Sequence, residues 1–452
     1  MKILFVAFEF PPLNRGGVFR PYSFVKYLQE FGIIPIVVTL AEESYSSVYD
    51  QFVIDRSIAK DLPMDTKLFA IEAENHEQST SRLNNFINIY FSIHGREVKK
   101  WEKNFIKQID QIISEYKPTA ILATVPPFSV LPLVYKTSVK FKLPLILDFR
   151  DAWSQWRTMP YGTILHYKLA LSFERKYLSH CSAVIATSLQ TIEDFKELHP
   201  GIPENKYNYI PNGFNGQLMH WKGLDTTKEK ITIGYVGTFY YNPEARDQML
   251  TPWWKKKAHR KLQYIPQKQD WLYRTPFFFF KTLQQLKKSN PELYAKICVK
   301  FVGKKQDWLL KMIREFGLDD VVHILGQVSH DEAIRFQQEC DLLFITSAKR
   351  IGGNDYSIAG KTFEYIQSGK PILAFVAEGA QKDILSEAGT ALICDPDDIK
   401  GSTELFSQLL CGRSVLVPNY NFIETLRRDK LTSKLADIIR RVVKTDNELL
   451  PA

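Results

Sequence analysis

"IGGNDYSIAGKTFEYIQSGKPILAF", residues 351–375, predicts a glycine-rich loop, a helix and a buried strand. Residues three and four apart lie on one face of a helix, so this helix is expected to carry a polar stripe made of Ser357, Gly360, Lys361, Glu364 and Ser368. A glycine inside a helix costs about 1 kcal/mol relative to alanine. Gly360 therefore indicates a bare backbone patch against which a polar ligand can lie.

On both sides of this stretch, short β-branched runs alternate with amphipathic segments, a pattern typical of parallel sheets covered by helices. Strands are expected in the first half at residues 2–8, 34–40, 120–124, 144–149, 183–187 and 207–210. In the second half they are expected at residues 231–237, 297–303, 321–326, 341–346, 371–376 and 390–395. Helices such as 17–31 and 163–179 fall between them. The sequence thus predicts an α/β protein with two doubly wound, Rossmann-like sheets.

The domain boundary is expected in residues 210–230, which combine Pro211, three glycines and polar residues. This gives a first domain of residues 1–213 and a second of residues 214–419, the latter with an insertion at 251–280. Residues 420–452 follow the last strand and begin with a basic amphipathic helix. We expect that helix to pack back on the first domain.

The charge, the cysteine spacing and the apolar stretches of the chain limit the classes of function that it can have. The chain has 452 residues and a formal charge of +9, which favours polyanionic partners such as nucleotides, lipid phosphates or nucleic acid without choosing among them. Its five cysteines show no CxxC or other metal-ligand spacing, so neither a disulfide nor a metal role is expected. No apolar stretch approaches the roughly 18 residues that span a bilayer. A cytoplasmic protein, or one bound at a membrane surface, is expected.

Two candidate sites lie in the first half, each after a predicted strand. Gly16 and Gly17 precede a helix whose amino end can bind a phosphate, with Arg15 and Arg20 adding charge; the alternative is a plain turn. The pattern is not G-x-G-x-x-G, which disfavours a dinucleotide site. Asp148, Arg150 and Asp151 end the strand at 144–149, where α/β sheets bind ligands. Arg150 could instead pair with Asp148, which leaves Asp151 as the better functional candidate.

The third candidate site is the opening stretch itself. Glu364 can accept two hydrogen bonds from hydroxyl groups, while Lys361 and the N–H groups near Gly360 can hold a diphosphate. The alternative is a surface ion pair between Lys361 and Glu364, worth a few tenths of a kcal/mol.

Two stretches, residues 83–108 and 251–280, join aromatic side chains to clusters of Lys and Arg. They are expected either to contact an anionic or lipid-linked partner, or to pack their aromatic rings inward and leave only the lysines in water.

Taken together, "FPP…GG…R", "LDFRDAW", "IPNG", "YVGTF", "FVG", "LGQVSHDE" and "GKTFEYIQSGKPIL" resemble retaining glycosyltransferases of the GT-B fold, group 1 (family four), which use nucleotide sugars. The resemblance implies two Rossmann-like domains facing across a cleft. It assigns donor binding to Gly16, Gly17, Gly237, Thr238, Lys304, Ser357, Gly360, Lys361 and Glu364. It places the acceptor near Arg20, Arg150 and Asp151.

Two family features are absent from this sequence. Glu364 matches the second glutamate of the family's E-x7-E motif, but Tyr356 stands at the first, with Asp355 beside it. The segment "ATVPPFS" holds no histidine where many members carry one near the reacting sugar. A nucleotide-sugar epimerase and a non-catalytic nucleotide-sugar-binding subunit therefore remain as alternatives.

The resemblance implies transfer of a sugar with retention, in which Lys361, Lys304 and the Gly16–Gly17 amides stabilise the leaving diphosphate. Asp151 would orient or deprotonate the acceptor hydroxyl. No metal or cofactor is expected if those cations suffice. The expected partners are a nucleotide sugar, an acceptor glycan such as one linked to polyprenyl diphosphate, and an anionic membrane surface, with no nucleic acid.

Overall fold

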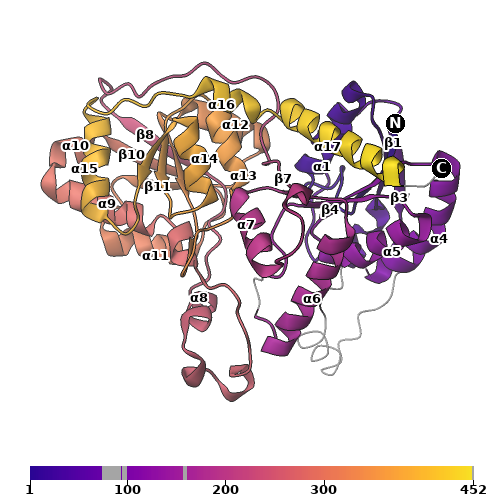
Figure 1. Cartoon of the computed structure of the whole chain (residues 1–452). Helices are drawn as coiled ribbons and strands as arrows, with labels where there is room; N and C mark the ends of the chain where they lie inside the picture. Colours follow the sequence, from indigo (N-terminus) through magenta and orange to yellow (C-terminus); the bar gives the residue numbers. More distant parts are fainter. Residues whose placement is uncertain (74–92, 94–98, 156–159, 450–452) are drawn as a thin grey trace. The chain divides into compact units, whose positions relative to one another are not determined.

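The computed structural model describes residues 1–73, 93, 99–155 and 160–449, and this part of the chain divides into two compact units (Figure 1). The first comprises Met1–Asn212, Trp253–Pro266 and Arg428–Ala452, and the second comprises Gly213–Pro252 and Gln267–Arg427. None of the described helices is both long enough and apolar enough to cross a membrane.

The first unit is built on a seven-stranded parallel sheet of order β3-β2-β1-β4-β5-β6-β7. Its strands are β1 (Lys2–Ala7), β2 (Ile34–Leu40), β3 (Lys67–Ile71), β4 (Ile121–Val125), β5 (Leu145–Phe149), β6 (Ala183–Ala186) and β7 (Tyr207–Tyr209). Its main helices are α1 (Phe19–Leu28), α4 (Lys99–Tyr116), α5 (Leu131–Phe141), α6 (Ile164–His180), α7 (Leu189–Leu198) and α17 (Arg428–Leu449). A short helix, α2 (Tyr45–Val48), follows β2.

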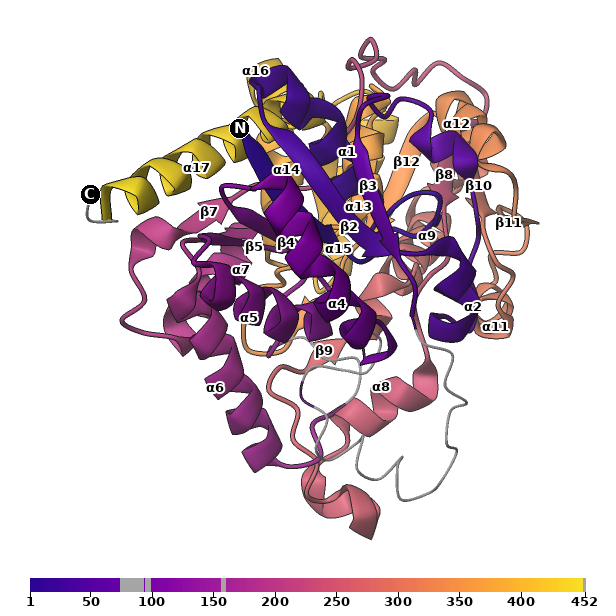
Figure 2. The same ribbon diagram turned by 90° about the vertical axis from the view of Figure 1, so that its right-hand side faces the viewer.

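Helices cover both faces of this sheet, which is why its central strands are mostly apolar. Along β1, Leu4 and Val6 join one core cluster with Trp101 and Phe105 of α4. The alternate residues Ile3, Phe5 and Ala7 join a second cluster whose members include side chains of α1 and α17. Figure 2 shows α4 and α5 with the strands of this sheet.

The second unit has a six-stranded parallel sheet of order β11-β10-β8-β12-β14-β15. The strands are β8 (Ile231–Val236), β10 (Ile297–Val302), β11 (Val322–Gly326), β12 (Leu342–Thr346), β14 (Ile372–Phe375) and β15 (Ala391–Cys394). The helices are α8 (Pro243–Leu250), α9 (Phe277–Ser289), α10 (Pro291–Ala295), α11 (Asp307–Phe316), α12 (His330–Glu339), α13 (Gly360–Gln367), α14 (Ala380–Ala388), α15 (Ile399–Leu410) and α16 (Tyr420–Thr425). Two short strands, β9 (Gln269–Asp270) and β13 (Lys349–Arg350), pair in antiparallel fashion.

Two doubly wound parallel sheets confirm the predicted fold class, and every predicted strand is present. The edge strand β3 was not predicted, because its sequence KLFAI is partly exposed and lacks a long apolar run.

The expected insertion at residues 251–280 does not stay within one unit. Residues 253–266 belong to the first unit, whereas 267–280 belong to the second. Phe278, Phe279 and Phe280 are buried core residues of α9, so they are not part of a surface.

The other aromatic stretch, residues 83–108, is described only in part. Most of residues 83–98 lie outside the described residues, and Trp101, which follows them, is buried with its ring N–H donating to the Ile71 carbonyl at 3.0 Å. The helix expected at the start of residues 420–452 is two helices: α16 belongs to the second unit and α17 to the first.

Candidate functional site

A glycine follows each of the strands β8 and β10, and these two residues, Gly237 and Gly303, lie against each other. Gly237 has a φ of 123°, and its N–H donates to the carbonyl of Val302 at 2.8 Å. A Cβ on Gly303 would collide with the carbonyl oxygen of Gly237. Glycine at both positions therefore allows the loop after β8, with half-buried Thr238, to approach the loop after β10, with exposed Lys304.

Lys361, in the first turn of α13, reaches the end of β8. Its Nζ donates to the carbonyl of Val236 at 2.8 Å and lies 3.8 Å from the centre of the Tyr235 ring. Burial of the amine lowers the pKa of Lys361 to about 7, although the charge of Glu364 opposes this shift. The carbonyl supplies an acceptor but no negative charge, so the ammonium form lacks a full counter-charge that an anionic ligand could provide.

The start of α13 is open. Ala359, the residue before the helix, provides no side-chain cap, and a Cβ on Gly360 would meet nothing within 4 Å. Helix amino ends with exposed N–H groups attract anions. The first turn of α13 thus supplies both the amine of Lys361 and the open amino end of the helix.

Glu364 lies one turn further along α13 and is exposed. Within the described part of the chain its carboxylate makes no hydrogen bond or ion pair, and Lys361 bonds to Val236 instead of forming the alternative Lys361–Glu364 ion pair. Its oxygens are therefore available to ligand hydroxyl groups.

The polar stripe of five residues was wrong in extent, because α13 includes only Gly360, Lys361 and Glu364 of the five. Ser357 lies in the preceding loop, where its hydroxyl donates to the carboxylate of Asp355 at 2.6 Å. Ser368 follows the helix and donates to the Tyr365 carbonyl. Gly360 is the first helical residue, so the cost of a mid-helix glycine does not apply.

Asp355, next to the missing first glutamate, is directed inward. It is buried, which raises the pKa of its carboxyl group despite the hydrogen bond from Ser357. Its backbone is fixed as well, because the carbonyl accepts from the N–H of Ala380 at 2.8 Å. Asp355 therefore ties the loop to the start of α14.

Gln381 is a positioning residue that sequence reasoning missed. Its buried side-chain oxygen accepts from the N–H of Ala359 at 2.9 Å and from the hydroxyl of Thr362, while its nitrogen donates to the carbonyl of Thr346. It thus links the start of α13 to the end of β12. The sequence signal that could have indicated Gln381 is its place in the first turn of α14, a helix that directly follows Gly379.

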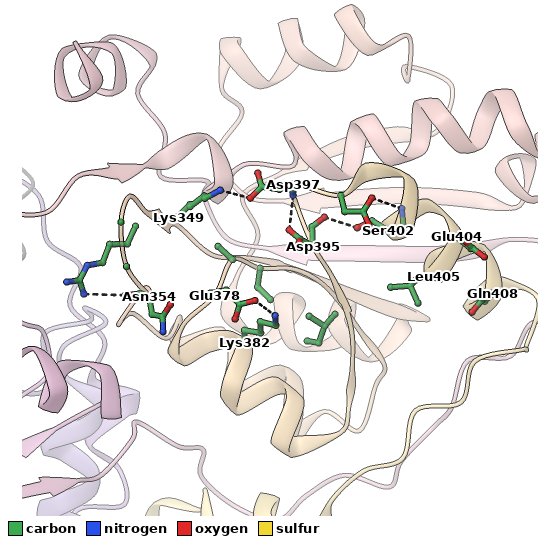
Figure 3. Close-up of a pocket in the computed structure, with 18 residues that line it drawn as sticks. Lys349, Asn354, Glu378, Lys382, Asp395, Asp397, Ser402, Glu404, Leu405 and Gln408 are labelled. Atoms are coloured by element: carbon green, nitrogen blue, oxygen red, sulfur yellow. Dashed lines mark hydrogen bonds and ion pairs between the residues drawn. The ribbon is translucent and has the colours of Figure 1, made fainter. Parts of the chain in front are cut away.

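A polar cavity of about 720 Å³ lies in the same unit, beyond the ends of β14 and β15 (Figure 3). Lys349 pairs with Asp397 across it, and Lys382 pairs with Glu378. None of these four residues was a candidate from the sequence. Its wall also includes Asn354, Asp395, Ser402, Glu404 and Gln408.

In the first unit, Arg20 and Asp148 form a buried bidentate pair, with the closest N–O distance at 2.8 Å. Thr124 donates to the same carboxylate, and Arg20 also donates to the Pro211 carbonyl. Asp148 is thus paired with Arg20. The alternative expectation, a pair between Asp148 and Arg150, was wrong. The guanidinium of Arg20 is 4% exposed, which fits a structural role better than the expected contact with an acceptor.

Arg150 forms an ion pair with Glu9, which lies two residues after β1 and was not a candidate from the sequence. It also donates to the carbonyls of Gly17 and Pro126, and a Cβ on Gly17 would collide with it. By contrast, a Cβ on Gly16 would meet nothing within 4 Å. The half-buried Asp151 follows Arg150 beyond β5.

The described residues contain no cluster of His, Cys, Asp and Glu that could hold a metal ion.

Comparison with solved structures shows which known folds this chain shares. The lipopolysaccharide outer core galactosyltransferase WaaB aligns over 98% of this chain and 99% of its own, with 14% identity and a TM-score of 0.59. HepE from Anabaena, solved with UDP-glucose, aligns over 99% and 100%, with 16% identity and a TM-score of 0.51. A UDP-GlcNAc 2-epimerase from Neisseria meningitidis, bound to UDP-GlcNAc, aligns over 98% and 100%, with 11% identity and a TM-score of 0.50.

No curated protein sequence gives a significant match. At these identities the structural likeness shows the fold alone. The family comparison is more specific, and its matched segment contains the end of β12, the loop that follows it and α13. Residues 273–417 of this GT-B chain match the family of glycosyl transferases group 1.

Proposed function

We propose that this protein transfers a sugar from a nucleotide diphosphate to an acceptor hydroxyl, with retention at the anomeric carbon. The observation that carries the proposal is the first turn of α13, within the matched segment. There the helix start at Gly360 is open and the amine of Lys361 lies beside it, while the carboxylate of Glu364, which has no partner among the described residues, lies one turn further along.

The chemistry of that turn suits a nucleoside diphosphate. Glu364 would accept hydrogen bonds from the ribose hydroxyls, and the N–H groups at Gly360 with Lys361 would hold the phosphates. As the sugar leaves, negative charge grows on the diphosphate, and Lys361 together with Lys304 would stabilise it. We expect no metal ion and no other cofactor.

For the acceptor we propose a glycan, carried by a lipid such as polyprenyl diphosphate, in the assembly of a cell-surface polysaccharide. WaaB, which shares the fold, is named for the lipopolysaccharide outer core. Asp151 in the first unit is the candidate that orients or deprotonates the acceptor hydroxyl, and Gly16 offers an open backbone to a phosphate.

Product analysis with a panel of nucleotide sugars tests this proposal. A transferred sugar whose anomeric configuration matches the donor supports it, whereas inversion would overturn retention. A free epimer would instead assign the chain to nucleotide-sugar epimerases, a class represented among the fold neighbours. Binding of a nucleotide sugar without turnover, with every acceptor class tried, would indicate a non-catalytic subunit.

A further inference from the structure

Residues 253–266 form a basic segment of the first unit with exposed apolar side chains. They contain five Lys and Arg residues and no acidic residue. Trp253 is 63% exposed, Trp254 is 61% exposed and Leu262 is 74% exposed. Exposed tryptophans are unusual in a water-soluble surface because their large rings are normally buried at least in part.

The amino-terminal end of α6 has a similar surface. Ile164, Leu165 and Leu169 are exposed, with Leu165 at 72%, and the exposed Lys168 lies among them. The opposite side of the same turns is buried through Tyr167 and Ala170. This helix therefore has apolar residues on both sides, although among the described residues only one side is buried.

Backbone hydrogen bonds join these two segments. The N–H of Tyr161 donates to the carbonyl of Tyr264 at 2.8 Å, and the N–H of Tyr264 donates back at 2.9 Å. The Tyr167 ring lies 4.9 Å from that of Tyr264 and 5.3 Å from that of Tyr161. Leu262 thus lies two residues from a bridge that starts three residues before α6. Figures 1 and 2 both show the segment beside the amino end of α6.

We propose that residues 253–266 and 164–169 of the first unit form one docking face for an anionic phospholipid bilayer. The charge of the face is complementary to that of acidic lipids, since it exposes Lys255, Lys257, Lys261 and Lys168 and neither segment contains Asp or Glu. Tryptophan rings settle at the headgroup level and leucines just below it, while lysine side chains extend to the phosphates.

The inference deepens the proposed function by naming a membrane as the place where a lipid-linked acceptor would be met. Lipid binding is measured without donor or acceptor, however. The membrane proposal can therefore be right where the proposed sugar transfer is wrong, and wrong where the transfer is right. A second copy of this chain would also cover the apolar residues, but two copies of a uniformly basic face repel each other.

Co-sedimentation of the full chain with vesicles tests the proposal. One vesicle type is phosphatidylcholine alone, and the other contains about one third phosphatidylglycerol to provide the negative surface. The charge variant is Lys255→Glu with Lys257→Glu and Lys261→Glu, and the apolar variant is Trp253→Ala with Trp254→Ala. The matched control is Lys60→Glu with Lys67→Glu and Lys434→Glu, exposed lysines elsewhere in the same unit.

Wild type and control are expected to bind the anionic vesicles and to dissociate at high salt, because ions screen surface charges beyond about 8 Å even at 0.15 M. Each face variant should lower the partition coefficient about tenfold or more, with an unchanged thermal transition. A blue shift of tryptophan emission on vesicles, lost in Trp253→Phe with Trp254→Phe, should accompany binding.

Equal binding by the control and both face variants would overturn the proposal, as would equal binding to neutral vesicles. A dimer in sedimentation analysis that Trp253→Ala with Trp254→Ala dissociates, without vesicle binding, would assign the face to a second copy instead.

Discussion

The Cβ atom that Gly237 lacks would lie 2.7 Å from Nζ of Lys361. Real Cβ atoms essentially never make contacts that short, so with a side chain at residue 237 the amine would have to shift. The loop after β8 and the first turn of α13 therefore meet here: the missing side chain of Gly237 leaves the space in which the cation of the proposed donor site lies beside the Val236 carbonyl.

We accordingly predict that Gly237→Ala impairs nucleotide binding beyond its effect on stability. Backbone strain at a positive φ should cost roughly 1–3 kcal/mol of unfolding free energy. The matched control is Gly317→Ala, which also has a positive φ but would meet nothing within 4 Å. Both variants should lose stability in denaturant unfolding, but only Gly237→Ala should lose about tenfold or more in nucleoside diphosphate affinity. Equal affinities would contradict the coupling.

The second prediction concerns protons. Because burial lowers the pKa of Lys361 to about 7, much of its amine is neutral in the free protein above that pH. A bound diphosphate favours the ammonium form, so binding at pH 8 should take up close to one proton, and affinity should fall as the pH rises above 7. Calorimetry in buffers of different ionisation enthalpy measures the uptake, with UDP, GDP and ADP as probes.

Two variants separate Lys361 from general charge effects. Lys361→Met should abolish the proton uptake and slow turnover, while Lys304→Met, which removes an exposed cation after β10, should weaken binding and leave the uptake in place. Unchanged uptake in Lys361→Met would show that another group titrates.

Glu364 provides the third prediction, which concerns the ribose. The carboxylate is exposed and has no partner among the described residues, so Glu364→Ala should leave thermal stability nearly unchanged. It should weaken UDP binding about tenfold, since hydrogen bonds to a charged group contribute roughly 1.5–3 kcal/mol. A 2′-deoxy nucleotide already lacks one of these bonds, so its affinity should fall less. Equal losses for the ribo and deoxy nucleotides would place Glu364 away from the sugar.

The sequence predicted the strands well because most buried parallel strands are largely apolar runs, whereas β3, an edge strand with few buried residues, has no such signal. Local patterns also singled out Lys361, Gly237 and Glu364 as candidates, and their roles stay predictions. They could not show that Arg20 is neutralised by Asp148, because that pair joins residues 128 positions apart. The division of residues 251–280 between the units could not be predicted for a similar reason, since it involves contacts between residues far apart in sequence, such as the backbone bonds between Tyr264 and Tyr161.

The fourth prediction is that transfer does not need a divalent cation, because Lys361 and Lys304 would neutralise the diphosphate. The pattern Asp395-Pro396-Asp397 is the rival candidate for a metal-binding pair. In the structure Asp397 is ion-paired with Lys349 and accepts from the Tyr273 hydroxyl, and Asp395 accepts from the N–H of Asp397. Activity should persist in excess EDTA. The expectation would be overturned if EDTA abolished the activity, magnesium or manganese restored it, and Asp395→Asn caused the same loss.

The last prediction concerns Tyr264, whose backbone and ring hold residues 253–266 on the first unit. Tyr264→Ala keeps both backbone bonds but removes the ring packed 4.9 Å from Tyr167, and Tyr264→Pro also removes the N–H that donates to Tyr161. Segments held by few contacts open locally without global unfolding. Trypsin should therefore cut after Lys255, Lys257 or Lys261 faster in both variants, most in Tyr264→Pro, while the thermal transition stays in place. The control is Tyr240→Ala, an exposed tyrosine of the second unit. Cleavage at the wild-type rate in both variants would show that other contacts hold the segment.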